Sequence, residues 1–245
     1  MLLAGVATLL AAAIQSTTGF GFALVLGPAL FIVLAPGEAV AVLLGLGIAM
    51  NLLMLLGERR RLEVRRGDVA ALVVAAVPGL AVGGLLLEAL TKSTLQVVVG
   101  VAVLVAACAQ LAASPTAHEG ATGGTRALAY PVGLASGALT TSTSISGPPL
   151  VLWLARRAAS PDELRDSLTA CFLALNVLGA IALAVVVGPR AIAPPADVLL
   201  LVPLVAAGYL AGRRAFRRLD AERHRRIVLA TVIVAGSASL LAGVW

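Results

Sequence analysis

Long apolar stretches, separated by short polar segments, make up most of the chain. A helix that crosses the hydrocarbon core of a bilayer needs about 20 apolar residues, because each residue advances the helix by about 1.5 Å. Six stretches have this length, and we expect each to be a spanning helix. They cover residues 38–57, 69–88, 93–113, 164–188, 197–216 and 227–244. The pattern predicts an all-α membrane protein.

Two other apolar stretches do not have the length of one simple span. Residues 2–35 would form a helix about 50 Å long in a hydrocarbon core of about 30 Å. Residues 128–155 are interrupted by a run of hydroxyl side chains. Irregular backbone inside a bilayer occurs only where protein or a water-filled cavity satisfies its polar groups. Each stretch is therefore either a tilted, kinked span or a re-entrant hairpin built from a broken helix.

Each of these stretches contains a polar island. The first island, residues 15–22, reads QSTTGFGF, and the second, residues 140–146, reads TTSTSIS and precedes Gly-Pro-Pro. A shift of 125 residues superposes the islands, and after a four-residue insertion a shift of 129 continues the match. We infer an internal duplication, with a first repeat at 1–113, a linker at 114–126 and a second repeat at 127–245. The aligned pairs include Pro36 with Pro161, Asn51 with Asn176, Gly79 with Gly208 and Gly83 with Gly212.

The distribution of basic residues distinguishes the kinked-span interpretation from the re-entrant hairpin interpretation. Lys and Arg are enriched on the cytoplasmic side of membrane proteins. Eight full crossings would divide the 18 Lys and Arg residues 7 to 11, whereas two re-entrant hairpins place 16 of them on one side. Only Lys92 and Arg190 then lie opposite. No Lys or Arg precedes the first hairpin, so that hairpin rests on its length and on the duplication.

The predicted fold class is an all-α membrane protein with an inverted-topology repeat, each half a re-entrant hairpin with a broken helix plus three transmembrane helices. We expect a multi-pass protein of the cell (inner) membrane, with the Arg-rich loops 58–68 and 213–226 and the linker 114–126 in the cytoplasm. The composition agrees, because 12% of the residues are charged, against about 25% in soluble domains. The net charge of +6 comes from arginines at the ends of apolar segments. That pattern sets membrane orientation, so no nucleic-acid partner is expected.

Inverted repeats with discontinuous helices are typical of transporters that bind their substrate near the membrane midplane. Two hairpin tips that meet there would present helix N-termini, whose free N–H groups and partial positive charge favour an anion. Glycine lets the backbone approach such a ligand closely. We therefore expect a small anion to contact both islands and the paired asparagines. The candidate substrate-binding residues are Gln15, Thr17, Thr18, Gly19, Gly21, Phe22, Asn51, Thr141, Thr143, Ser144, Ser146, Gly147, Pro148 and Asn176.

Plainer interpretations stay open. Ser and Thr in membrane helices often bond a carbonyl one turn back and have no further role, and intramembrane asparagines can simply join helices. An anion channel or an accessory membrane subunit would keep the hairpins without alternating access. We do not expect an enzyme, a metal ion or a cofactor, because His118 and His224 lie in polar segments and no carboxylate lies at membrane depth. The expected partners are the lipid bilayer and a small anion, and homo-oligomerisation is left open.

The two islands and their flanks resemble those of the sulfite exporter TauE/SafE family of membrane permeases. The segments that carry the resemblance are TGFGFALVLGPAL at 18–30 and ASGALTTSTSISGPPLVLWL at 135–154. The resemblance implies export or uptake of sulfite, of sulfonates such as sulfoacetate, or of related small organic anions. For a transporter of this kind we expect alternating access. Ser144 and Ser146 stand where many members of the family have glycines. The choice of anion, the direction of transport and the coupling ion therefore stay open.

Overall fold

The computed structural model describes residues 2–58, 60–98, 128–188 and 200–216, together with positions 101, 237 and 241. All regular structure in these residues is helical, which confirms the all-α prediction. A further helical segment, residues 92–98, follows α4. The helices are α1 Leu2–Thr18, α2 Phe22–Val33, α3 Pro36–Gly57, α4 Arg66–Ala89, α6 Ala129–Thr143, α7 Gly147–Ala155, α8 Pro161–Val186 and α9 Leu201–Phe216.

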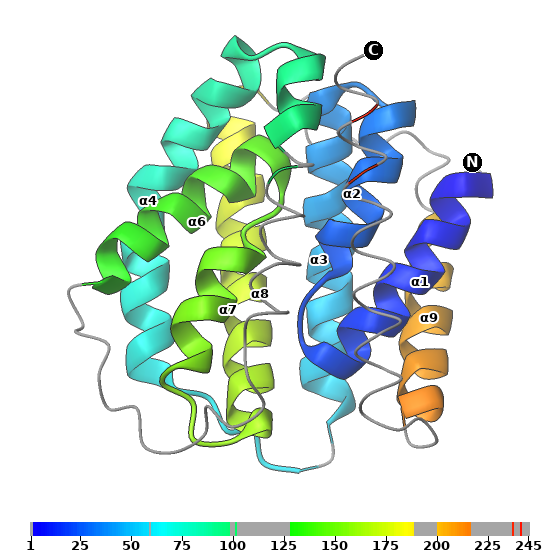
Figure 1. Ribbon diagram of the computed structural model, residues 1–245, viewed down its shortest axis with the longest axis vertical. Coiled ribbons are helices and arrows are strands. Elements are labelled where there is room, and N and C mark those ends of the chain that lie inside the picture. Colours follow the sequence, from blue (N-terminus) through cyan, green and yellow to red (C-terminus); the bar gives the residue numbers. More distant parts are fainter. Residues whose placement is uncertain are drawn as a thin grey trace.

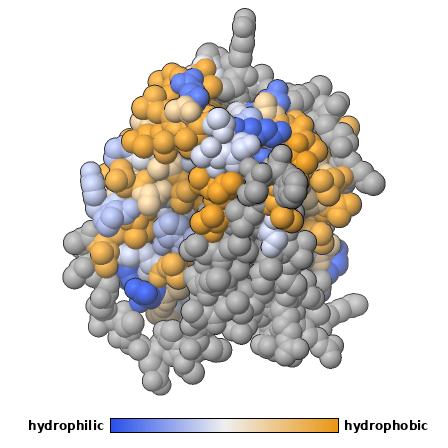
Figure 2. Space-filling view, turned by 45° about the horizontal axis from the view of Figure 1, so that its top comes forward, coloured by the Kyte–Doolittle hydropathy of each residue, from blue (hydrophilic) through white to orange (hydrophobic). Residues whose placement is uncertain are grey.

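Three of these helices, α3, α4 and α8, are long and apolar enough to cross a membrane. They match the predicted spans 38–57, 69–88 and 164–188, and α9 covers the described part of the predicted span 197–216. Of the predicted span 93–113 the structure describes residues 93–98 and 101, and of the predicted span 227–244 it describes positions 237 and 241. The linker 114–126 lies outside the described residues. Large apolar side chains on the surface fit a lipid environment, and Figure 2 shows them over much of one face.

Both long apolar stretches are broken helices. α1 ends at Thr18 and α2 begins at Phe22, with Gly19 and Gly21 between them at φ 81° and 105°. Glycine adopts this left-handed backbone at little cost. The second break falls between α6 and α7, where Ser144 has φ 61°. In Figure 1 the chain reverses at each break, so that α2 returns beside α1 and α7 beside α6. An unbroken helix over either stretch is therefore wrong.

The helix boundaries follow the same shift as the sequence. Adding 125 to the end of α1 and to the starts of α2 and α3 gives 143, 147 and 161, which are the end of α6 and the starts of α7 and α8. The packing corresponds as well, because α4 packs against α6 while α9 packs against α1. The glycine-containing helix of each half thus lies on the broken helix of the other half.

Glycines allow these two helix pairs to approach closely. A Cβ atom on Gly79 or Gly83 of α4 would meet backbone carbonyl oxygens of α6. A Cβ atom on Gly208 or Gly212 of α9 would likewise meet carbonyl oxygens of α1. Small residues spaced four apart permit this kind of backbone contact in membrane helices. The two interfaces therefore depend on the absence of side chains at these positions.

Buried apolar side chains gather in two clusters. The first comes mainly from α1, α2, α3 and α9, with Leu26, Leu43 and Val205 among its buried members. The second comes from α4, α6, α7 and α8, and includes Leu72 and Leu150. We call these groups of helices the first and second packing bodies. α3 packs against α8 where the two bodies meet, and the candidate site lies at that junction.

Candidate functional site

A cavity of about 40 Å³ lies where the two helix breaks meet. One water molecule needs about 10–15 Å³ on this measure, so the cavity has room for about three waters or one compact ion. Its wall combines the start of α2 and the middle of α3 from the first packing body with the second break and the middle of α8 from the second. The lining residues are Gln15, Gly21, Phe22, Ala23, Leu24, Leu43, Gly47, Asn51, Ser144, Ile145, Ser146, Gly147, Phe172 and Asn176.

The cavity brings together residues that lie far apart in the sequence. Eight of the predicted site residues line it: Gln15, Gly21, Phe22, Asn51, Ser144, Ser146, Gly147 and Asn176. The other six predicted residues are not part of the lining: Thr17, Thr18, Gly19, Thr141, Thr143 and Pro148.

Sequence reasoning missed six lining residues. Gly47 lies one helical turn before Asn51, and Phe172 lies one turn before Asn176, so a search along the helix faces of the asparagines would have found both. Gly47 and Phe172 also align under the shift of 125. Ala23 and Leu24 occupy the first turn of α2, where the expectation of free N–H groups already pointed. The remaining two, Leu43 and Ile145, carried no polar signal.

Most hydroxyl groups of the two islands bond to backbone. Thr17 and Thr18 donate to the carbonyl of Ile14 at 2.7 and 3.0 Å. Thr143 donates to the carbonyl of Leu139 at 3.0 Å. The hydroxyl of Thr141 instead crosses to α4 and donates to the Leu80 carbonyl at 2.6 Å. For these groups the plainer interpretation, local bonding and helix packing, accounts for the side chain.

Three polar side chains of the lining behave differently. Ser144, Ser146 and Asn176 are 6%, 3% and 9% exposed, and their side chains make no hydrogen bond within the described residues. Their polar atoms are not among the fully buried side-chain atoms of the described residues that lack a partner, so these groups face the open space of the cavity. A ligand or ordered water in the cavity would satisfy all three.

The two helix starts at the cavity offer different numbers of amides. At α2, the N–H of Phe22 donates to Oε1 of Gln15 at 3.2 Å. The N–H groups of Ala23 and Leu24 lie in the first turn, where no intrahelical acceptor exists. At α7, Pro148 and Pro149 have no N–H to donate. The predicted pair of matching N-termini is therefore unequal, and α2 contributes more donors.

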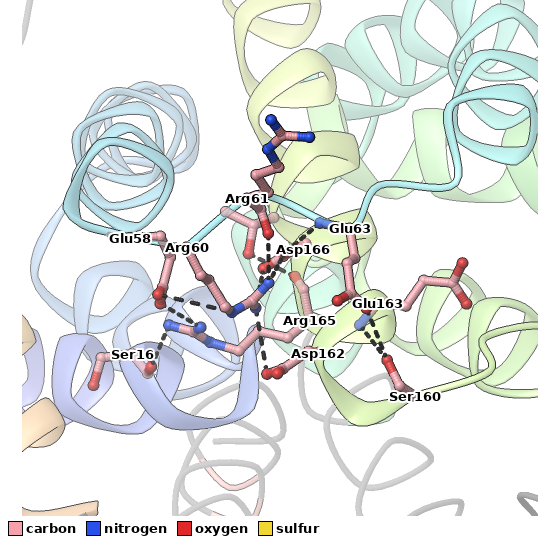
Figure 3. Close-up of polar contacts among 11 residues, drawn as sticks. Ser16, Glu58, Arg60, Arg61, Glu63, Ser160, Asp162, Glu163, Arg165 and Asp166 are labelled. Atoms are coloured by element: carbon pink, nitrogen blue, oxygen red, sulfur yellow. Dashed lines mark hydrogen bonds and ion pairs between the residues drawn. The ribbon is translucent and has the colours of Figure 1, made fainter.

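Charged side chains are absent from the cavity lining but concentrate at one end of the bundle (Figure 3). There, Arg165 at the start of α8 donates to Glu58 at 2.6 Å and to the carbonyl of Ser16 in the last turn of α1 at 3.1 Å. Arg60 binds both carboxylate oxygens of Asp166, at 2.8 and 3.0 Å. These ion pairs tie the first break and α3 to α8. A cation near the last carbonyls of a helix also complements its dipole.

The nearby arginines hold the pKa of the Glu58 carboxyl group below its ordinary value. Burial alone would raise the pKa of its carboxyl group, but the hydrogen bond and charge of Arg165, together with the more distant Arg60, outweigh burial and lower that pKa below its ordinary value. Gly19 packs against the same arginine, since a Cβ atom there would lie 2.9 Å from Cγ of Arg165. The first break is therefore held closely at this end of the bundle.

The predicted Arg-rich loops 58–68 and 213–226 begin at the same end of the bundle. Arg213, near the end of α9, donates to the carbonyl of Gly57 at 3.0 Å. This contact places the end of α3 and the end of α9 at the same end of the bundle. The cytoplasmic location of this arginine-rich end stays a prediction.

Comparison with known proteins decides the family. The sequence model of the sulfite exporter TauE/SafE family matches residues 4–239. The chain belongs to this family. A protein of Cupriavidus necator named "Probable sulfite/organosulfonate exporter TauE" is 28% identical to this TauE/SafE chain over 233 residues, which cover 93% of the chain and 88% of that relative. No solved structure gives a significant match. The TauE/SafE chain is thus a multi-pass membrane transporter and not an enzyme.

Proposed function

We propose that this TauE/SafE protein transports a small oxyanion, sulfite or an organosulfonate, and binds it in the cavity between the two helix breaks. The observation that carries the proposal is a cavity with no charged side chain in its lining, where the side chains of Ser144, Ser146 and Asn176 make no hydrogen bond within the described residues. The C. necator relative, named as a sulfite/organosulfonate exporter, supports the choice of anion.

Neutral donors suit a transporter because they hold an anion without trapping it. The hydroxyls of Ser144 and Ser146, the amide of Asn176 and the first-turn N–H groups of α2 can all donate to sulfite oxygens. The dipole of α2 adds a partial positive charge at the same place. A buried arginine would bind the anion more strongly but would itself cost several kcal/mol in the membrane interior. A site built from neutral donors therefore still allows the anion to be released on the far side of the membrane.

For the fold, we propose two inverted-topology repeats, residues 1–113 and 127–245, each with a re-entrant hairpin and three transmembrane helices. The matching helix boundaries and the exchanged packing of α4 and α9 support this plan. Alternating access would then be a rocking of the two packing bodies about the cavity. The ion pair between Arg165 and Glu58 joins α8 to the end of α3 at the arginine-rich end, which we place in the cytoplasm.

The proposal is tested by counterflow in proteoliposomes that contain the purified protein. Labelled sulfite and labelled sulfoacetate are offered outside against an excess of unlabelled anion inside, with sulfate and acetate as comparison anions. Saturable, anion-specific counterflow is the expected result. An ohmic current carried by the same anions, without counterflow, would support the channel interpretation instead, and absence of both would overturn the proposal.

A further inference from the structure

Asn51 and Asn176 occupy equivalent positions in the two halves, but their side chains are used differently. Oδ1 of Asn51 accepts from Nε2 of Gln15 at 2.8 Å, and Nδ2 of Asn51 donates to the carbonyl of Gly47 at 2.8 Å. Asn176 lines the same cavity and is 9% exposed. Its amide makes no hydrogen bond within the described residues. Both ends of one asparagine amide are thus occupied, and those of the other are not.

The two asparagines differ in their hydrogen bonds because the residue equivalent to Gln15 is different in the second half. Gln15 is long enough to reach from α1 both to Asn51 and to the N–H of Phe22. The equivalent residue in the second half is Thr140, which is short, and its hydroxyl donates to the Ser136 carbonyl at 2.7 Å within α6. Asn176 therefore has no counterpart of Gln15 to hold it.

We propose that Asn176 is the asparagine that contacts the transported anion, whereas Gln15 and Asn51 are positioning residues that hold the start of α2 against α3. This inference rests on the proposed function. The two halves then have different roles in the site. Gln15 and Asn51 of the first half form a fixed wall of the cavity, and the second half supplies the side chains that contact the anion. Ser144 and Ser146, whose side chains also make no hydrogen bond within the described residues, belong to the same half as Asn176.

Gly47 provides a way to disturb Asn176 without replacing it. A Cβ atom on Gly47 would lie 2.5 Å from Nδ2 of Asn176, the far end of a side chain that can move. Gly45, in the same helix, has open space at its Cβ position. Gly47→Ala should therefore displace the Asn176 amide while α3 stays intact, and Gly45→Ala is its matched control.

The experiment measures sulfite and sulfoacetate binding to the purified full-length protein in nanodiscs by calorimetry, and thermal unfolding without anion. We expect Asn176→Ala and Gly47→Ala to weaken binding about tenfold or more, as for a lost hydrogen bond to a charged group, with little change in Tm. Gly45→Ala should bind as the wild type does. Gln15→Ala and Asn51→Ala should lower Tm in the absence of anion. The double variant should lose less than the sum of the two, because both changes remove the shared bond between the side chains, while each also removes one bond of its own.

Opposite patterns overturn the inference. Unchanged affinity in both Asn176→Ala and Gly47→Ala would remove Asn176 from the contact with the anion. Additive losses of Tm for Gln15→Ala and Asn51→Ala would show that the two side chains do not act as a unit. A wild-type protein that binds neither anion would overturn the proposed function itself, which separates that failure from a wrong division of roles.

Discussion

At the scale of single residues, the hydroxyl groups near the second break fall into two sets. Ser142 bonds to the carbonyl of Ala138 at 2.7 Å, whereas Ser146, four residues later, lines the cavity. Both side chains are almost fully buried. The two serines are similarly buried, but only the Ser142 hydroxyl has a hydrogen-bond partner within the described residues. This pair therefore offers a direct test of which hydroxyls contact the anion.

Ser146→Ala should weaken sulfite binding about three- to tenfold, because one hydrogen bond contributes roughly 1 kcal/mol. Ser142→Ala should bind sulfite as the wild type does, since its hydroxyl already bonds to the backbone. Titration calorimetry of the two variants side by side provides the measurement. Equal losses in both variants would mean that the serines act through the fold of the break.

The residues of the site could be predicted only in part. The sequence shows where polar groups lie along the chain, and that was enough to find Ser144, Ser146 and Asn176. It does not show which way a hydroxyl turns, because the rotation of a helix about its axis is determined by its packing. Thr141 illustrates this, since its hydroxyl reaches α4, a helix some 60 residues away in the sequence.

At the scale of helices, the contact between α4 and α6 depends on backbone meeting backbone. A Cβ atom at Gly83 would collide with the carbonyl of Ala138, and the carbonyl cannot move without shifting α6. Forcing extra atoms into a well-packed interface costs typically about 1–3 kcal/mol. Gly67, in the first turn of the same helix, has no atom within 4 Å of its Cβ position.

Gly83→Ala should therefore lower the Tm of the purified protein clearly, whereas Gly67→Ala should leave it unchanged or slightly higher because alanine is the better helix former. Differential scanning fluorimetry of the two variants checks this. A Gly83→Ala protein as stable as Gly67→Ala would show that α4 and α6 are further apart than the structure places them.

The helices themselves were largely predictable. Pro36 and Pro161 open α3 and α8 because proline fits the first helical turn, where its missing N–H is not needed. The first broken helix was expected from the length of its stretch, and the second from the run of hydroxyl residues that interrupts it. The exchange of α4 and α9 between the halves was not predictable, because glycine spacing indicates a close contact without naming the partner helix.

At the scale of the whole molecule, the arginine-rich end joins the two packing bodies through charge. Glu58 has a lowered pKa, so its ionised form is stabilised in the folded protein. A carboxyl group of this kind adds stability above its unfolded pKa, about 4.3, and loses it as the pH falls through the lowered folded value. The contribution is therefore complete at neutral pH.

Glu58→Gln should accordingly be less stable than the wild type at pH 7, and the difference in Tm should shrink as the pH is lowered below about 4. Thermal unfolding in detergent across this range provides the measurement, with Glu38→Gln as a control, because the Glu38 carboxylate bonds only to the exposed N–H of Ala35. A difference in Tm between Glu58→Gln and the wild type that grows as the pH falls would contradict the predicted pH dependence.

The proposed inverted topology predicts the sides on which two helix starts lie. Gly37, at the start of α3, and Ala159, just before α8, should react with a membrane-impermeant thiol reagent from opposite sides when each is replaced by cysteine. The natural cysteines, Cys108 and Cys171, are first replaced by alanine. Labelling of both positions from the same side would contradict the inverted repeat.

The exchange of α4 and α9 bears on how such a chain arose and assembles. Residues 1–113 alone would leave the glycine face of α4 bare and α1 without its neighbour. In the proposed inverted repeat, a second copy of this half in the opposite membrane orientation would provide the missing surface. A half-length ancestor could therefore have been complete as an antiparallel dimer, and two halves of today's chain, produced as separate polypeptides, should find each other in the bilayer.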